Sequence, residues 1–116
     1  MPVTASINRQ DGGPAVVTLA GRMTLGSSLS LVESQVRSAI NGGAHRMVLD
    51  LTGVEFIDSA GLGMLIHVYG SLCSRGGVLR LCGVAPRILS LLELTKTNTL
   101  LAIDPTLAQS LAALDA

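Results

Sequence analysis

The chain has 116 residues and no net charge, because eight Lys and Arg side chains balance eight Asp and Glu side chains. Apolar residues make up 48% of the chain and charged residues only 14%, against about 25% in an ordinary soluble domain. This composition argues against nucleic-acid binding, which needs a basic surface and usually aromatic stacking platforms, whereas Phe56 and Tyr69 are the only aromatic residues here.

The length suits a single domain over residues 1–116. No apolar run reaches the roughly 18 residues of a membrane span, and the first residues do not resemble a signal peptide. We therefore expect a soluble, cytoplasmic protein that makes no membrane contact.

Two strands are predicted at residues 3–9 and 14–20, with Asp11, Gly12 and Gly13 between them as the turn of a hairpin. A helix follows, because apolar residues recur at spacings of three and four. They are Leu29, Val32, Val36 and Ile40. Ser27 or Ser28 is expected to cap the start of this helix, and the Asn-Gly-Gly run at 41–43 ends it.

The aliphatic run at 46–51 predicts a central strand, and a second helix is expected after it. The stripe predicted to be buried on that helix is Leu62, Leu65, Ile66, Tyr69, Leu72 and Cys73. Strands are predicted at 78–83 and 99–103, with a short helix from Pro86 to about Leu94 between them.

Asp104 and Pro105 are read as the cap and first position of a last helix, whose buried face is Leu107, Leu111 and Leu114. The resulting order is ββαβαβαβα. Strands that alternate with helices predict an α/β fold with a mixed, mostly parallel sheet of about five strands, helices packed on the sheet, and an antiparallel hairpin at the N-terminus.

The segment EFIDSAGLGMLIHVYG, residues 55–70, concentrates polar and small residues at the start of the second helix. Asp58 or Ser59 can cap that helix. Capping does not explain Gly61 and Gly63, since a glycine inside a helix costs roughly 1 kcal/mol relative to alanine. The pair of glycines indicates that another group, either a phosphate or a partner protein, approaches the backbone closely.

Known catalytic patterns are missing from the sequence. There is no phosphate-binding Gly-x₄-Gly-Lys-Ser/Thr loop, and His45 and His67 lack metal-ligand spacing to an acid or thiol. Asp50 stands at a strand end as in response-regulator receivers, but the acidic pair and well-placed lysine of that class are missing. We therefore expect no enzymatic activity, metal or cofactor, and two buried free thiols at Cys73 and Cys82.

The run VLDLTGVEFIDSAGLGML resembles the signature of the STAS-domain anti-sigma-factor antagonists. The resemblance extends to the opening hairpin, to LAGRM before the first helix, and to GGVLRLCGVAPRILSLLELTKTNTLLAI after the second. It implies the STAS fold and a regulatory switch. The unmodified protein binds an anti-sigma factor, which is an ATP-binding serine kinase, and thereby releases a sigma factor. Phosphorylation of Ser59 then ends binding, and a metal-dependent serine phosphatase restores it.

The loop after the second strand departs from this family. Members commonly carry an acid in a Gly-x-Leu-Asp pattern, where this chain has Gly21, Arg22, Met23 and Thr24. Thr24 therefore stands in the expected neighbourhood of the phosphoacceptor, together with Asp58 and the two glycines. A structural role in the turn is the alternative for Thr24.

The partner-binding face is expected on the second helix, outside its predicted buried stripe. Its members are Met64, His67, Val68 and Ser71, together with Ser59 and the 22–26 loop that contains Arg22 and Met23. The alternative for Met64 and Val68 is that neighbouring helices cover them. The protein is expected to be a monomer or weak dimer. The alternative function is a STAS scaffold or transporter-associated interaction module, in which Ser59 is never modified.

Overall fold

The computed structural model describes residues 1–9 and 12–115. Its elements are β1 (Thr4–Arg9), β2 (Ala15–Met23), α1 (Ser27–Asn41), β3 (Arg46–Ile57), α2 (Ser59–Ser74), β4 (Val78–Cys82), α3 (Pro86–Leu94), a 3₁₀ turn (Thr97–Thr99), β5 (Ala102–Asp104) and α4 (Leu107–Asp115). The predicted order of strands and helices is confirmed. Of the predicted hairpin turn, Asp11 lies outside the described residues, whereas Gly12 has a φ of 73°, a conformation that glycine adopts readily.

The five strands form one sheet in the order β1-β2-β3-β4-β5. β1 pairs antiparallel with β2, and each later strand pairs parallel with its neighbour, which confirms the predicted mixed sheet. β3 is longer than predicted and continues to Ile57, because register shifts near Ala20 and Arg22 allow β2 to follow it to the pair Met23↔Ile57.

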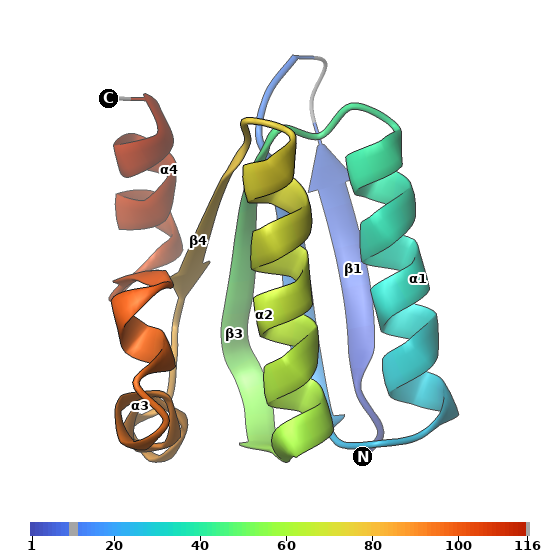
Figure 1. The fold of residues 1–116 in the computed structure, drawn as a ribbon, viewed down its shortest axis with the longest axis vertical. Helices are drawn as coiled ribbons and strands as arrows, with labels where there is room; N and C mark the ends of the chain where they lie inside the picture. The colour runs from blue at the N-terminus through green and yellow to red at the C-terminus, as the bar shows by residue number, and fades with distance from the viewer. Residues whose placement is uncertain (10–11, 116) are drawn as a thin grey trace.

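Helices α1 and α2 lie side by side over one face of the sheet (Figure 1). The alternate residues of the strands that face them are fully buried, as Val17, Leu19, Leu49 and Leu81 show. α4 packs on β3, β4 and β5 from the opposite face, where Ser110 meets the side chain of Asp104. The core that supports α2 therefore consists almost entirely of aliphatic side chains.

Two helix starts differ from the predictions. α1 is preceded by Gly26 and has no side-chain cap, so neither Ser27 nor Ser28 has the predicted role. α4 begins at Leu107, and the hydroxyl of Thr106 accepts a hydrogen bond from the Gln109 N–H at 3.2 Å.

Asp104 is the last residue of β5 and does not cap α4. Its carboxylate accepts hydrogen bonds from the Arg80 guanidinium at 2.6 and 3.0 Å and from the Ser110 hydroxyl at 2.7 Å. Ser110 is fully buried, while the predicted buried face of Leu107, Leu111 and Leu114 is only half-buried. A polar contact thus fixes the centre of α4 to the sheet.

The last strand is shorter than predicted. Residues 99–103 were expected to be extended, but a 3₁₀ turn occupies Thr97–Thr99 and β5 begins at Ala102. Threonine hydroxyls bond back to carbonyl oxygens here, from Thr95 to Leu91 at 2.8 Å and from Thr99 to Lys96 at 2.7 Å. These local bonds compete with strand pairing and keep the chain turned.

Candidate functional site

The start of α2 and the loop that follows β2 lie at the same edge of the sheet. The parallel pairing of β2 with β3 ends at Met23↔Ile57, so both chains leave the sheet together. The Asp58 N–H then donates to the Met23 carbonyl oxygen at 3.2 Å. This register brings the 24–26 loop beside Ser59, although the two segments are far apart in the sequence.

The carboxylate of Asp58 joins these two segments. One oxygen, Oδ1, accepts the Gly61 N–H at 2.9 Å and caps α2, as predicted for either Asp58 or Ser59. The other, Oδ2, accepts the Leu25 N–H at 2.9 Å. The Leu25 and Gly61 amides hold the pKa of Asp58 below its ordinary value of 3.8, since both hydrogen bonds favour the ionised form.

Asp58 contacts the loop on both sides of Thr24. The Met23 carbonyl precedes this residue and the Leu25 amide follows it, and both bond to Asp58. Thr24 itself is half-buried. The position expected for Thr24, in the neighbourhood of Ser59, therefore agrees with the fold.

Ser59 is exposed and is the first residue of α2. The first N–H groups of a helix have no partner within the helix, and the helix dipole favours negative charge at this end. A phosphate on the Ser59 hydroxyl would lie where such a group is electrostatically favoured. A phosphate at this position is therefore expected to leave α2 folded.

The two glycines of the segment have different roles. A Cβ on Gly61 would overlap the carbonyl oxygen of Met23 and would lie 2.9 Å from the Met23 Cβ. Gly61 is thus required by close packing within the domain, which was not among the predicted reasons. A Cβ on Gly63 would meet nothing within 4 Å. Only Gly63 leaves open space for an approaching partner.

The predicted exposed face of α2 is wrong for its two apolar members. Met64 is 2% exposed and Val68 is 3% exposed, and both belong to the core. The buried side of α2 consists of Gly61, Met64, Leu65, Val68 and Leu72, while Leu62, Ile66 and Tyr69 are only half-buried. The helix is rotated by about one residue relative to the prediction. Since aliphatic residues surround most of its circumference, their spacing could not determine which side faces the sheet.

Met23 is also buried, so its side chain offers no surface to a partner. Arg22 is exposed, as expected, and its guanidinium carbon lies 4.6 Å from the centre of the Phe56 ring. Of the other residues predicted to bind a partner, His67 is exposed and Ser71 is half-buried.

The surface that α2 does expose beside Ser59 consists of small residues and one histidine. Ser59, Gly63, His67 and Gly70 are all exposed. Leu25 stands next to this surface and is 83% exposed, and its amide is bonded to Asp58. We call Leu25, Ser59, Gly63 and His67 the switch face. Sequence reasoning missed Leu25, although the 22–26 loop was expected to take part.

The two cysteines are free but differ in burial. Cys82 is buried as predicted, and burial together with the charge of Asp50 raises its pKa to about 11. Cys73 is exposed, so the prediction of a second buried thiol is wrong. The exposure of Cys73 follows from the rotation of α2 relative to the prediction. Asp50 accepts hydrogen bonds from the Thr52 amide at 3.0 Å and the Thr52 hydroxyl at 2.6 Å, as expected of a polar strand residue.

Comparison with known proteins identifies the class of this fold. The family model of the STAS domain matches residues 5–110. The chain therefore belongs to the STAS-domain family, and the predicted fold class is confirmed. Within residues 1–9 and 12–115, no three His, Cys, Asp or Glu residues are grouped as a metal site. Over the same residues, no helix has the length and apolar character needed to cross a bilayer.

Within that family the chain is similar to anti-sigma factor antagonists. It is 31% identical over 84 residues to the anti-sigma F factor antagonist of Paenibacillus polymyxa, a match that covers 72% of this chain and 71% of the relative. An anti-sigma factor antagonist from Mycobacterium paratuberculosis superposes with a TM-score of 0.84 at 24% identity, over 98% and 95% of the two chains. The antagonist SpoIIAA in its unphosphorylated form gives 0.82 at 13% identity, over 97% and 96%. These two structural likenesses concern the fold alone.

Proposed function

We propose that this chain is an anti-sigma factor antagonist whose binding is switched by phosphorylation of Ser59. In its unmodified form it binds an ATP-dependent serine kinase that acts as the anti-sigma factor, and the sigma factor is released. A serine phosphatase reverses the modification. The single observation that carries this proposal is the exposed Ser59 hydroxyl at the start of α2, beside a loop held by Asp58.

The switch face has the character of a docking surface. Gly63 presents bare backbone, and a side chain there would have free space around it, so a partner can approach the helix closely. Leu25 adds an exposed apolar side chain at the edge of this area. An apolar residue next to small residues suits a contact in which the partner supplies the larger side chains.

Release on phosphorylation follows from charge. A phosphate adds about −1.5 to −2 charges at neutral pH, beside the ionised carboxylate of Asp58. The domain tolerates this charge because the start of α2 is exposed and electropositive. In the complex the same charge would lie in a contact area shaped for a neutral hydroxyl. A penalty of about 3 kcal/mol in the complex would weaken affinity more than a hundredfold.

A phosphorylated state is known for a similar protein, since SpoIIAA has been solved in both its unphosphorylated and its phosphorylated form. For the present chain we assign the phosphoacceptor to Ser59 and give Thr24 a structural role, because Thr24 is half-buried between the two residues that bond to Asp58. The chain itself catalyses no step of this cycle, which we place in the cytoplasm, with residues 1–116 acting as one domain.

The test is a phosphorylation assay with serine-kinase anti-sigma factors from the same genome. The wild-type chain and the variants S59A and T24A are incubated with each kinase and ATP, and intact mass and fragment spectra are recorded. We expect one phosphate on the wild-type chain and on T24A, and none on S59A. S59A should hold the kinase in the presence of ATP, while S59D should bind it weakly.

Two results would overturn the assignment. Phosphate on Thr24 or Ser71 of S59A, at the wild-type rate, would move the acceptor elsewhere. A chain that binds a kinase-type anti-sigma factor but never gains a phosphate would favour a scaffold without a switch.

A further inference from the structure

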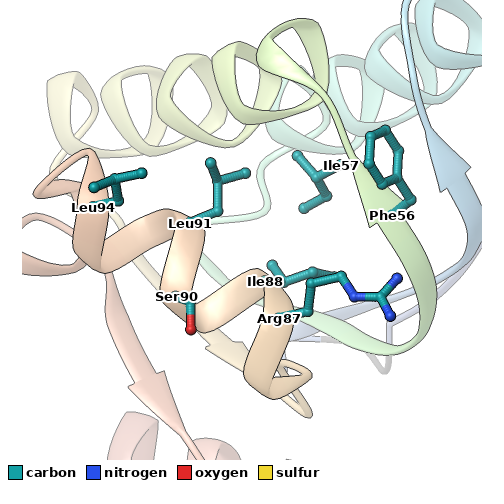
Figure 2. A pocket seen from close by; sticks show the side chains of 7 residues that line it. All are labelled: Phe56, Ile57, Arg87, Ile88, Ser90, Leu91 and Leu94. Atoms are coloured by element: carbon teal, nitrogen blue, oxygen red, sulfur yellow. The ribbon is translucent and has the colours of Figure 1, made fainter.

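A second surface feature lies outside the switch face, between the end of β3 and helix α3. It is a groove with a volume of about 300 Å³, lined by Phe56, Ile57, Arg87, Ile88, Ser90, Leu91 and Leu94. Figure 2 shows Leu94 and Leu91 on α3 in a row with Ile57 and Phe56 on β3. No member of the switch face lines it.

The groove is apolar along most of its length. Ile57 and Ile88 are buried at its base, Phe56 and Leu91 are half-buried, and Leu94 is 81% exposed. One exposed leucine is ordinary on a protein surface, but here Leu94 continues a row of apolar side chains into a concave site. An aliphatic chain bound along this row would cover apolar surface that water now contacts.

Positive charge is placed at the Phe56 end. The side chain of Arg87 lines the groove and extends toward β3 in Figure 2. Arg22 lies over the ring of Phe56, at 4.6 Å from its centre. The ion pairs found among the described residues involve neither Arg22 nor Arg87, and no acidic side chain lines the groove. These guanidinium groups are thus available to an anion.

We propose that this groove binds a small amphipathic carboxylate, with its aliphatic chain along Ile57, Leu91 and Leu94 and its carboxylate at Arg87. A guanidinium suits a carboxylate because it offers two parallel N–H donors. A volume of about 300 Å³ lies at the lower end of the range for small-molecule sites, so the groove fits a chain of medium length. This inference does not depend on whether Ser59 is phosphorylated.

The test is an NMR titration of the ¹⁵N-labelled full chain with octanoate, butyrate and 1-octanol. Octanoate should shift the amide signals of Ile57, Ile88, Leu91 and Leu94. Butyrate should bind about 250-fold more weakly if the whole octanoate chain is buried, since it lacks four methylenes and each buried methylene contributes roughly fourfold in affinity. 1-Octanol retains the aliphatic chain and lacks the carboxylate, so its affinity separates the contribution of the chain from that of the charge at Arg87.

Two exposed positions provide the variants. R87Q should weaken octanoate binding about tenfold, as expected for a lost charge-assisted hydrogen bond, and should leave octanol binding unchanged. L94Q should weaken both ligands. R37Q is the matched control, because Arg37 is an exposed arginine on α1, away from the groove.

The proposal is overturned if octanoate fails to shift the groove signals, if butyrate binds as well as octanoate, or if R87Q and R37Q have the same affinity for octanoate. Thermal unfolding of each variant verifies that it is folded. If octanoate does not bind to the folded wild-type chain, the groove is instead a contact site for a segment of another protein.

Discussion

The different surroundings of the two glycines of α2 allow a direct test of the packing at the start of this helix. The perturbation is Gly61→Ala, with Gly63→Ala as its matched control. In Gly61→Ala the new methyl group would overlap the Met23 carbonyl oxygen and lie 2.9 Å from the Met23 Cβ and 3.2 Å from Ile57 Cγ2. In Gly63→Ala it would meet nothing within 4 Å.

The magnitude follows from the difference between the two variants. Both gain the same helix propensity, about 1 kcal/mol for alanine over glycine. Only Gly61→Ala also has the overlap, and overpacking of this kind costs about 1–3 kcal/mol. The Met23 carbonyl and Cβ cannot rotate away, because β2 is fixed in the sheet. We therefore expect Gly63→Ala to be stabilised by up to about 1 kcal/mol, and Gly61→Ala to be about 1–3 kcal/mol less stable than Gly63→Ala.

The assay is urea unfolding followed by far-ultraviolet circular dichroism. The free energy of unfolding in water, and the slope of its dependence on urea concentration, are compared among the wild-type chain and the two variants. Equal stability of the two alanine variants would refute the close approach of α2 to Met23. A variant with a changed urea slope would have an altered unfolded or folded state, and its free energy of unfolding could not be compared directly with that of the other variant.

Three further predictions concern the same helix. Leu65→Ala should cost about 2–5 kcal/mol, because Leu65 is fully buried, and a loss under 0.5 kcal/mol in urea unfolding would contradict its place in the core. Val68→Glu should prevent folding or strongly lower the midpoint of thermal unfolding, since it buries a charge. His67→Glu, on the exposed side of α2, should change the free energy of unfolding by less than about 0.5 kcal/mol. Equal midpoints for the two variants would show that Val68 is exposed. Asp58 has a lowered pKa, so its contribution to the free energy of unfolding is complete above the ordinary value of 3.8 and is lost as the pH falls through the folded-state value. Below pH 3.8 the stability of Asp58→Ala should therefore depend less on pH than that of the wild-type chain. Parallel plots of stability against pH for the two chains would exclude this role.

Much of the fold could be predicted because local patterns and long-range packing agree. The spacing of Leu29, Val32, Val36 and Ile40 gives one clear apolar side, and these four residues are the buried residues of α1. The run at 46–51 is mostly aliphatic, as expected for a central strand covered on at least one face. The end of β3 could not be predicted, since it depends on register shifts against β2.

The candidate site was predicted only in part. Asp58 and Ser59 could be placed at the start of a helix, because capping residues are recognisable from sequence. The bond from the Leu25 amide to Asp58 joins residues 33 positions apart, and no local pattern reports it. The side of α2 that faces the sheet places Gly61 against Met23, a close contact that depends on three-dimensional packing.

The bonds that Asp58 makes to both neighbours of Thr24 have a consequence for the kinetics of recognition. A loop that is ordered only in a complex loses conformational entropy on binding, which weakens affinity and slows productive encounters. Here the loop is already fixed in the free protein, so Leu25 is presented in one geometry before any partner arrives. Association at this surface should therefore be limited by diffusion and orientation of the two molecules, with no slow ordering of the loop before the contact forms.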